Sequence, residues 1–194
     1  TWPQEEKRTR QLTMISEEAS RLSHVVTDIL DYSRLQAGVE KLSVVRFPLR
    51  PALEQAQQRY ELAASRRRIR IDLQCPEHEV LFDRGKFDQV MDNLLNNAVS
   101  HADSDSVLLI LATPGPAATR IAVQNAGPTI APEEQERIWD RYHRVQNIGE
   151  NQRLGTGLGL SIVKSILQRH GVEFGVFSER GVTAFWFDTC TKID

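Results

Sequence analysis

The chain has few cysteines, no long apolar run and no excess of basic residues. Its two cysteines, Cys75 and Cys190, lack the spacing of metal ligands, and one pair does not establish a disulfide, so a reducing cytoplasm is the simplest expectation. No apolar run approaches the roughly 20 residues that cross a bilayer, and no signal peptide is visible. The net charge of −2 excludes an overall basic surface for nucleic acid.

With 194 residues, of which 40% are apolar, the chain can bury one sizeable core and still carry a helical extension. Periodicity predicts helices and strands in irregular alternation, with some strands too close together for a crossover helix. We therefore expect an α/β fold in which helices cover one face of a mixed sheet. The predicted strands lie near residues 42–47, 69–73, 80–82, 107–112, 120–124, 172–177 and 183–188, and the predicted helices near 51–65, 87–102 and 157–170, with a short helix from Pro132.

A glycine-rich segment near the C-terminus has the pattern of a phosphate-binding loop. It reads Arg153-Leu154-Gly155-Thr156-Gly157-Leu158-Gly159-Leu160 and leads into an apolar, helix-periodic stretch that ends at His170. Glycine lets the backbone approach a ligand closely, and the first N–H groups of a helix have no partner within the helix. The expected ligand is an anion. The alternative is a simple tight turn, because glycine-rich turns before helices are common.

The helix predicted over residues 87–102 carries two asparagines at the edge of its apolar stripe. Asn93 and Asn97 are four residues apart and therefore lie on one side of the helix. Asparagine is a poor residue for a helix interior, so the pair needs an explanation. One explanation is a solvated flank. The other is that the two amide oxygens help to hold a hydrated Mg²⁺ between the protein and phosphates.

A third element lies between these two. The apolar run of residues 120–124 predicts a strand, which ends at Asn125-Ala126-Gly127-Pro128-Thr129-Ile130. A polar side chain at the end of a strand, followed by a turn, could present one hydrogen-bonding group to a base. By itself the segment is an ordinary turn.

In this order and at these distances the three elements resemble the ATP-binding domain of sensor histidine kinases. The wider group includes the gyrase, mismatch-repair and heat-shock-chaperone ATPases. The segment that resembles the F box of the family separates kinases from those other ATPases. Residues 89–98 resemble the N box, 125–130 the first glycine box, 138–144 the F box, 153–160 the second glycine box and 181–185 the last one.

This resemblance implies a two-layer α/β sandwich that binds ATP and Mg²⁺. It implies that Asn93 is the catalytic and metal-binding residue and that, together with Asn97, it positions Mg²⁺ and the phosphates. It also implies that Asn125 forms a hydrogen bond with adenine and that Gly127 lets the base come close. A polar stretch over residues 146–152 is the expected ATP lid. The other nucleotide-binding residues implied are Arg153, Gly155, Thr156, Gly157, Leu158, Gly159 and Thr183.

Two positions depart from the pattern of the family. Its first glycine box usually begins with Asp, whose carboxylate accepts the adenine amino hydrogen, whereas this chain has Asn125. An amide oxygen still accepts, but without a charge we expect a bond weaker by about 1 kcal/mol. Where many members have a Lys that points at phosphate, this chain has Ser100. Neutralisation of the phosphates would then depend more on Mg²⁺ and on arginines of the lid.

The N-terminal region predicts a helix that packs against other helices. Its apolar residues repeat at spacings of three and four, and Gly38 is a plausible stop. By resemblance, residues 1–40 are the second helix of a dimerisation and phosphotransfer hairpin, and residues 41–194 are the ATP-binding catalytic domain. The residues of the apolar seam are Leu12, Ile15, Ala19, Leu22, Val26 and Ile29.

None of the five histidines has the context expected of the phosphate acceptor, a helix in which the histidine is followed by an acidic residue; His78 is followed by Glu79 but falls in a predicted loop. His24 is followed by Val25, and His170 ends a helix, where a partial positive charge would suit the helix dipole. The resemblance therefore implies that the accepting histidine belongs to the first hairpin helix, which this chain lacks. We expect the fragment to be a monomer or a weak dimer.

The function implied is that of the catalytic part of a sensor histidine kinase, the cytoplasmic portion of a homodimeric bacterial membrane receptor. It would transfer the γ-phosphate of ATP to a histidine of the dimerisation helix, for relay to an aspartate of a response regulator. A degenerate nucleotide-binding or scaffolding module without kinase activity is one alternative, motivated by Asn125 and Ser100. An anti-sigma factor serine kinase is another, disfavoured by the N-terminal helix and the F-box segment.

Overall fold

The computed structural model describes residues 41–143 and 157–190, together with single positions in the first 40 residues. The chain divides into two compact units, Thr1–Glu40 and Lys41–Asp194. In the first unit every described position is helical, and the large apolar side chains there are exposed. Ile29 of the predicted seam lies outside the described residues, and the full length of this helix stays a prediction. The described positions are Arg8, Gln11, Leu12, Ile15, Ala19, Leu22, Val26 and Leu30.

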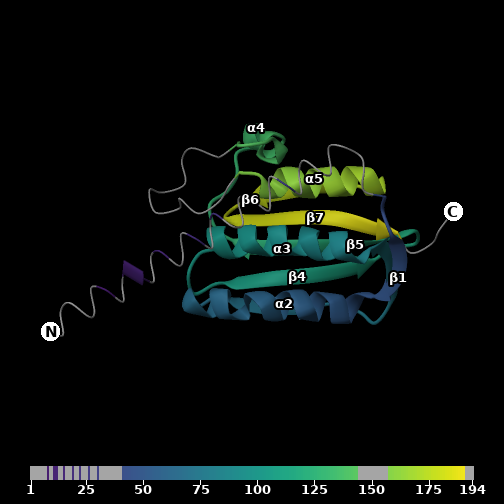
Figure 1. Cartoon of the computed structure of the whole chain (residues 1–194), viewed down its shortest axis with the longest axis horizontal. Coiled ribbons are helices and arrows are strands. Elements are labelled where there is room, and N and C mark those ends of the chain that lie inside the picture. Colours follow the sequence, from purple (N-terminus) through teal and green to yellow (C-terminus); the bar gives the residue numbers. More distant parts are fainter. Residues whose placement is uncertain are drawn as a thin grey trace. The chain divides into compact units, whose positions relative to one another are not determined.

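The second unit is built on a mixed seven-stranded sheet (Figure 1). The strand order is β1-β3-β7-β5-β4-β2, and β6 also pairs with β7. The β2–β4 pair is parallel, whereas the other pairs are antiparallel. The strands are β1 (Val44–Pro48), β2 (Arg70–Gln74), β3 (Glu79–Asp83), β4 (Val107–Pro114), β5 (Ala118–Ala126), β6 (Phe174–Glu179) and β7 (Val182–Cys190).

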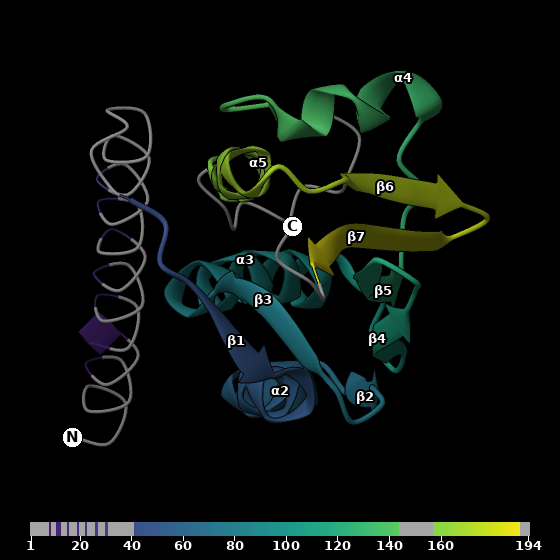
Figure 2. The same ribbon diagram turned by 90° about the vertical axis from the view of Figure 1, so that its right-hand side faces the viewer.

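Three helices, α2 (Leu49–Arg66), α3 (Arg84–His101) and α5 (Gly159–His170), lie side by side on one face of this sheet (Figures 1 and 2). A short helix α4 (Pro132–Gln135) and a 3-10 turn η1 (Arg137–Trp139) follow β5. The predicted α/β class and the two-layer sandwich are thus confirmed. No helix in the described part of the chain is long and apolar enough to span a membrane.

Several element boundaries differ from the prediction by two or three residues, and the starts of α2 and α5 differ for identifiable physical reasons. α2 begins at Leu49, before Pro51, because proline is tolerated in the first turn of a helix, where its missing N–H has no partner to lose. α5 begins at Gly159, two residues later than predicted, because Gly157 has a positive φ of 70° and cannot be part of the helix.

α3 is the centre of the helical layer, since it packs against both α2 and α5. Its apolar stripe is buried against the sheet, where Phe87 lies at ring-centroid distances of 6.0 Å from Phe82 and 6.1 Å from Phe187. These three rings are fully buried. Burying a large apolar side chain contributes about 1.5–3 kcal/mol, so the stripe fixes which side of α3 faces outward. The buried residues of α3 are Phe87, Val90, Met91, Leu94, Leu95, Ala98 and Val99.

Both ends of α3 are tied to neighbouring segments. At the N-terminus the carboxylate of Asp83 accepts from the backbone N–H of Lys86 at 3.1 Å and from that of Ser43 at 2.7 Å. At the C-terminus the guanidinium of Arg67 donates to the carbonyl oxygens of Ser100 and Ala102, each at 2.8 Å. The last carbonyls of a helix lack partners within it, so Arg67 caps α3 with a cation and sets where the helix ends.

His170 at the end of α5 is not the cation that its position predicts. Its ring stacks on Phe82, with centroids 3.7 Å apart. Its Nδ1 donates to the carbonyl of Ile166 at 2.8 Å, and its Nε2 accepts from the backbone N–H of Asp83 at 3.2 Å. A ring nitrogen that accepts a hydrogen bond carries no proton. The prediction of a positive charge here is wrong, and a neutral His170 ties the end of α5 to the start of α3.

The pKa of His170 predicts how the stability of the fold varies with pH. Burial lowers this pKa, and the nearby cations Arg169 and Lys86 lower it further, against the opposing effects of the bond to Ile166 and the carboxylate of Asp83. Because the folded pKa lies below the unfolded value of about 6.5, the unfolded state takes up more protons as the pH falls below 6.5. The contribution of His170 to stability is therefore present above about pH 6.5 and lost below it.

We expect the thermal midpoint to fall by a few degrees between pH 7.5 and pH 5.5, measured by circular dichroism. A His170→Phe variant keeps a ring on Phe82 but has no site to protonate, so its midpoint should change less over the same interval. Equal pH dependence in the two proteins would contradict the assignment.

Candidate functional site

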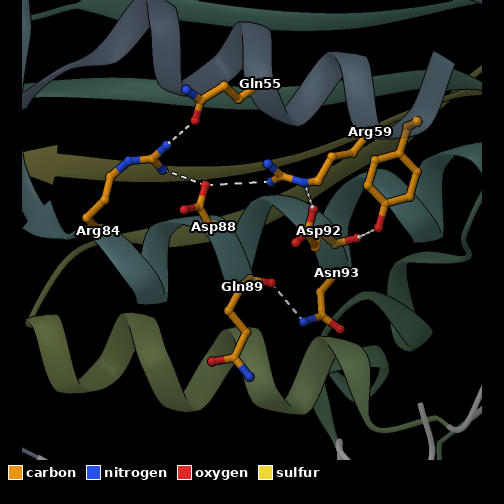
Figure 3. A network of polar contacts seen from close by, with 8 residues as sticks. Gln55, Arg59, Arg84, Asp88, Gln89, Asp92 and Asn93 are labelled. Carbon is orange, nitrogen blue, oxygen red and sulfur yellow. Dashed lines mark hydrogen bonds and ion pairs between the residues drawn. The ribbon is translucent and has the colours of Figure 1, made fainter. Parts of the chain in front are cut away.

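The side chain of Asn93 on α3 is held in one orientation. Its Nδ2 donates to the backbone carbonyl of Gln89 at 2.8 Å, one turn back along the helix (Figure 3). The other end of the amide, Oδ1, points at the first turn of α5, as the direction of the side chain in Figure 3 shows. A Cβ added at Gly159 would lie 2.7 Å from that oxygen. The structure thus places the acceptor oxygen of Asn93 beside Gly159, the first residue of α5. The sequence had indicated these two residues as parts of separate motifs.

On its opposite flank α3 is bound to α2 by a chain of charged groups (Figure 3). Arg59 contacts Asp92 at 2.9 Å and Asp88 at 3.6 Å, and Asp88 also pairs with Arg84. The Tyr60 hydroxyl donates to the backbone carbonyl of Asp92 at 2.8 Å. Each exposed pair contributes little, about 0–1 kcal/mol, but a network restrains rotation of the helix. Since Asp92 and Asn93 are adjacent, the same network keeps Asn93 turned toward α5.

The start of α5 has the properties of an anion site. Its N-cap residue, Leu158, makes no side-chain capping hydrogen bond, and the hydroxyl of Ser161 donates to the Leu158 carbonyl at 2.8 Å. The N–H groups and dipole of a helix N-terminus favour negative charge. Just before it, the carbonyl of Gly157 accepts from the backbone N–H of Tyr142 at 3.0 Å. A Cβ at Gly157 would lie 3.0 Å from the Tyr142 Cα, so this crossing and the positive φ both favour glycine.

A second polar cluster lies where β5 ends. Asn125 is 4% exposed, and its Nδ2 donates to the carbonyl of Ala126 at 3.2 Å, which leaves Oδ1 as the acceptor. Gly127 follows, and a Cβ there would lie 2.6 Å from the carbonyl oxygen of His101 at the end of α3. The absence of a side chain at this position is therefore a steric requirement of the fold. Its N–H donates to Gly181 at 2.9 Å.

Two buried hydroxyls complete the cluster at the end of β5. Thr183 lies directly opposite Asn125 across the β5–β7 pair, and its Oγ1 is 2.7 Å from the Oγ of Ser178 on β6. Ser178 was missed by sequence reasoning. The signal that could have found it is the alternation of residues 174–179, which turns a serine toward the buried face of an apolar strand.

The two clusters lie at different points of the same helix. Asn93 is in the middle of α3 and His101 is eight residues further on, which corresponds to about 12 Å along the axis at 1.5 Å per residue. An elongated ligand with an anionic end at α5 and a planar end at Gly127 would therefore lie along α3.

The sequence-predicted site residues that the structure describes fall into three sets. Asn93 contacts Gly159 as described, and Asn97 lies one turn further along the same edge, half-buried. Asn125, Gly127 and Thr183 come together at the other end. Gly157 and Leu158 lead into α5. Arg153, Gly155 and Thr156, like the lid stretch of residues 146–152, lie outside the described residues.

The donor set bears on which cation the site could hold. Among the described residues no group of three or more His, Cys, Asp or Glu could hold a metal ion. A divalent cation at Asn93 would therefore need oxygens from phosphates and water. Mg²⁺ is bound in this way, with few protein ligands, so the oxygen of Asn93 fits it.

An α/β sandwich with a helix start suited to an anion and a polar cluster at a strand end has the arrangement of a nucleotide-binding domain. The family described as histidine kinase-, DNA gyrase B- and HSP90-like ATPases matches residues 82–192. This match covers more than half of the chain, and the chain belongs to that family. Within it, the relatives and the fold identify the ATP-binding catalytic domain of a sensor histidine kinase.

Known proteins are similar over nearly the whole chain. Drug sensory protein A of Synechocystis sp. is 33% identical over 199 residues, which cover 95% of this chain and 29% of that protein. Full-length ShkA in complex with AMPPNP has a TM-score of 0.81 and 27% identity, over 94% of this chain and 39% of ShkA. Histidine kinase ThkA in complex with response regulator TrrA has a TM-score of 0.71 at 24% identity, over 92% of this chain and 50% of that one, and shows the fold. The chain spans about three tenths of the length of the curated relatives it matches first.

Substitution of Gly159 by alanine tests the contact between α3 and α5. The new Cβ would meet Oδ1 of Asn93 at 2.7 Å, and because that atom ends a flexible side chain, the amide can turn away without unfolding the protein. We expect weaker binding of a non-hydrolysable ATP analogue in calorimetry, on the order of tenfold, with little change in thermal midpoint.

Gly85→Ala is the matched control for Gly159→Ala. Gly85 also lies in a first helical turn, but a Cβ there would meet its nearest neighbour, Oδ1 of Asp83, at 3.6 Å, which is ordinary contact. This variant should bind the analogue like the wild type. Similar losses in both variants would show that the contact with Asn93 is not what matters.

Proposed function

We propose that this chain is the catalytic part of a sensor histidine kinase that binds Mg-ATP and transfers the γ-phosphoryl group to a histidine of a dimerisation helix. In the proposal residues 1–40 are the second helix of that hairpin and residues 41–194 the ATP-binding domain. The observation that carries it is the fixed Asn93 amide, whose oxygen meets the first residue of α5.

The residues of this chain would act by positioning the nucleotide. The oxygen of Asn93, with Asn97 one turn away, would hold Mg²⁺ and orient the phosphates at the start of α5, and Arg153 with the glycine segment would cover them. Bound Mg²⁺ would supply charge neutralisation on the phosphate oxygens. Phosphoryl transfer depends mainly on alignment and on such neutralisation, so no covalent step by the protein is needed.

The base would lie at the other end of α3. Oδ1 of Asn125 would accept a hydrogen from the adenine amino group, and Gly127 would let the base come close. In the transfer, the bond between the γ-phosphorus and the ADP oxygen breaks, and a bond forms from phosphorus to the unprotonated imidazole nitrogen. The other ring nitrogen gives up its proton to the acidic residue beside the accepting histidine. His170 is no acceptor, because both of its ring nitrogens bond within the fold.

The partner of such a kinase would be a response regulator whose aspartate receives the phosphoryl group. ThkA, which shares this fold, has been solved with response regulator TrrA. A degenerate nucleotide-binding module remains the second candidate, because an uncharged Asn125 stands where the family pattern has a carboxylate.

The Mg²⁺ site can be tested with Asn93→Ala in calorimetric titrations of a non-hydrolysable ATP analogue. With Mg²⁺ present we expect binding at least about tenfold weaker than in the wild type, and without Mg²⁺ a much smaller difference. The wild type, but not the variant, should also phosphorylate a separately supplied dimerisation domain, giving the acid-labile product of a histidine kinase.

Asn96→Ala is the matched control, because Asn96 is an exposed asparagine on the same helix. It should behave like the wild type in both measurements. Nucleotide binding without any transfer would favour the degenerate module, and an acid-stable product would favour a serine kinase.

The proposed hydrogen bond between Asn125 and adenine can be tested with the variant Asn125→Asp. A charged acceptor makes a hydrogen bond stronger by about 1 kcal/mol, so ATP affinity should rise about fivefold. The carboxylate would also lose the bond to Ala126 and be buried beside that carbonyl, so the thermal midpoint should fall. Calorimetry and thermal unfolding check both expectations; weaker ATP binding by the variant would contradict the proposed contact.

A further inference from the structure

A row of three buried polar side chains crosses the sheet at the base end of the proposed site. Asn125 on β5, Thr183 on β7 and Ser178 on β6 are register partners across two antiparallel strand pairs, and so lie on the same face. Their exposed fractions are 4%, 4% and 8%. Buried polar groups in a sheet need hydrogen-bond partners, and the proton positions in this row decide what it can bind.

The backbone N–H of Ile130 occupies one lone pair of the Ser178 hydroxyl. It donates to the Oγ of Ser178 at 2.8 Å, and it can only donate. Gln135 holds this contact in place, since its Nε2 donates to the carbonyls of Ile130 at 3.1 Å and Ser178 at 3.2 Å. Among the described residues, Oγ of Ser178 has one other partner, the Oγ1 of Thr183 at 2.7 Å. Either hydroxyl of this pair could donate, but the Ser178 proton has no other acceptor among the described residues, which favours donation from Ser178 to Thr183.

We propose that Ser178 is a positioning residue that makes the hydroxyl of Thr183 a hydrogen-bond donor toward the nucleotide base. Because Oγ1 of Thr183 accepts from Ser178, its own proton is left for a ligand. Beside it, Nδ2 of Asn125 is used by Ala126, so Oδ1 is left as an acceptor. The row then offers one acceptor and one donor side by side.

This pair matches adenine and opposes guanine. Adenine presents an amino donor next to a ring-nitrogen acceptor, N1 on one side and N7 on the other. Guanine presents the acceptor O6 where adenine has the amino group, and a donor at N1. The row of Asn125, Thr183 and Ser178 thus selects adenine over guanine, an inference that rests on the proposed function.

The test compares the wild type with Ser178→Ala by calorimetry, using ATP, 1-deaza-ATP, 7-deaza-ATP and GTP. The alanine variant frees Thr183 to point its proton elsewhere, so ATP should bind about three- to tenfold more weakly. GTP should be rejected less strongly relative to ATP. One of the two deaza analogues lacks the nitrogen that accepts the hydrogen bond from Thr183. The wild type should bind this analogue more weakly than ATP, and Ser178→Ala should lower its affinity little further.

Thr189→Val is the matched control for lost stability. Thr189 is on the same strand as Thr183, is fully buried, and donates to the carbonyl of Thr119 at 3.2 Å. Its removal should lower the thermal midpoint, as Ser178→Ala does, without changing any nucleotide affinity.

Two outcomes would overturn the inference in distinguishable ways. If Ser178→Ala weakens ATP and both deaza analogues by the same factor, Ser178 is merely structural while the proposed function stands. If the wild type binds no ATP, the proposed function fails and the inference fails with it.

Discussion

The arrangement of the site depends on one amide that a hydrogen bond holds in place. Nδ2 of Asn93 is bonded to the Gln89 carbonyl, so Oδ1 faces α5, and a Cβ at Gly159 would displace it. The contact explains two features of the sequence together. A poor helix former inside α3 is held by its bond to Gln89, and a glycine begins α5 where the oxygen of Asn93 lies. The preference for glycine thus reflects contact with another helix as much as loop flexibility.

α3 relates the two ends of the site because it is fixed at more than one point. The network with α2 restrains its rotation near Asn93, and Arg67 sets the position of its last carbonyls. Gly127 then packs on the His101 carbonyl. A rigid helix keeps the spacing between its residues constant. The distance between the anion end and the base end is therefore a property of α3 rather than of the loops around it.

Sequence reasoning found the elements that depend on periodicity and on glycine. The apolar stripe of α3, the strand before Asn125 and the mixed sheet were all predictable, since each follows from a local pattern. The charge state of His170 and the role of Ser178 were not. Both depend on backbone groups distant in sequence, the N–H of Asp83 and that of Ile130, which no local pattern reveals. The strand order likewise required long-range pairing.

The groups around residue 125 also explain why an amide side chain is favourable at this position. The carbonyl of Ala126 accepts from Nδ2 of Asn125 and from the backbone N–H of Asp103 at 2.9 Å, so a carboxylate at residue 125 would replace a donor with a charge facing an oxygen. An uncharged side chain avoids that repulsion in a buried place. Recognition of the base would then depend on the alternation of acceptor and donor, while most of the electrostatic attraction would come from the phosphates at α5. The two ends would divide selectivity and affinity between them.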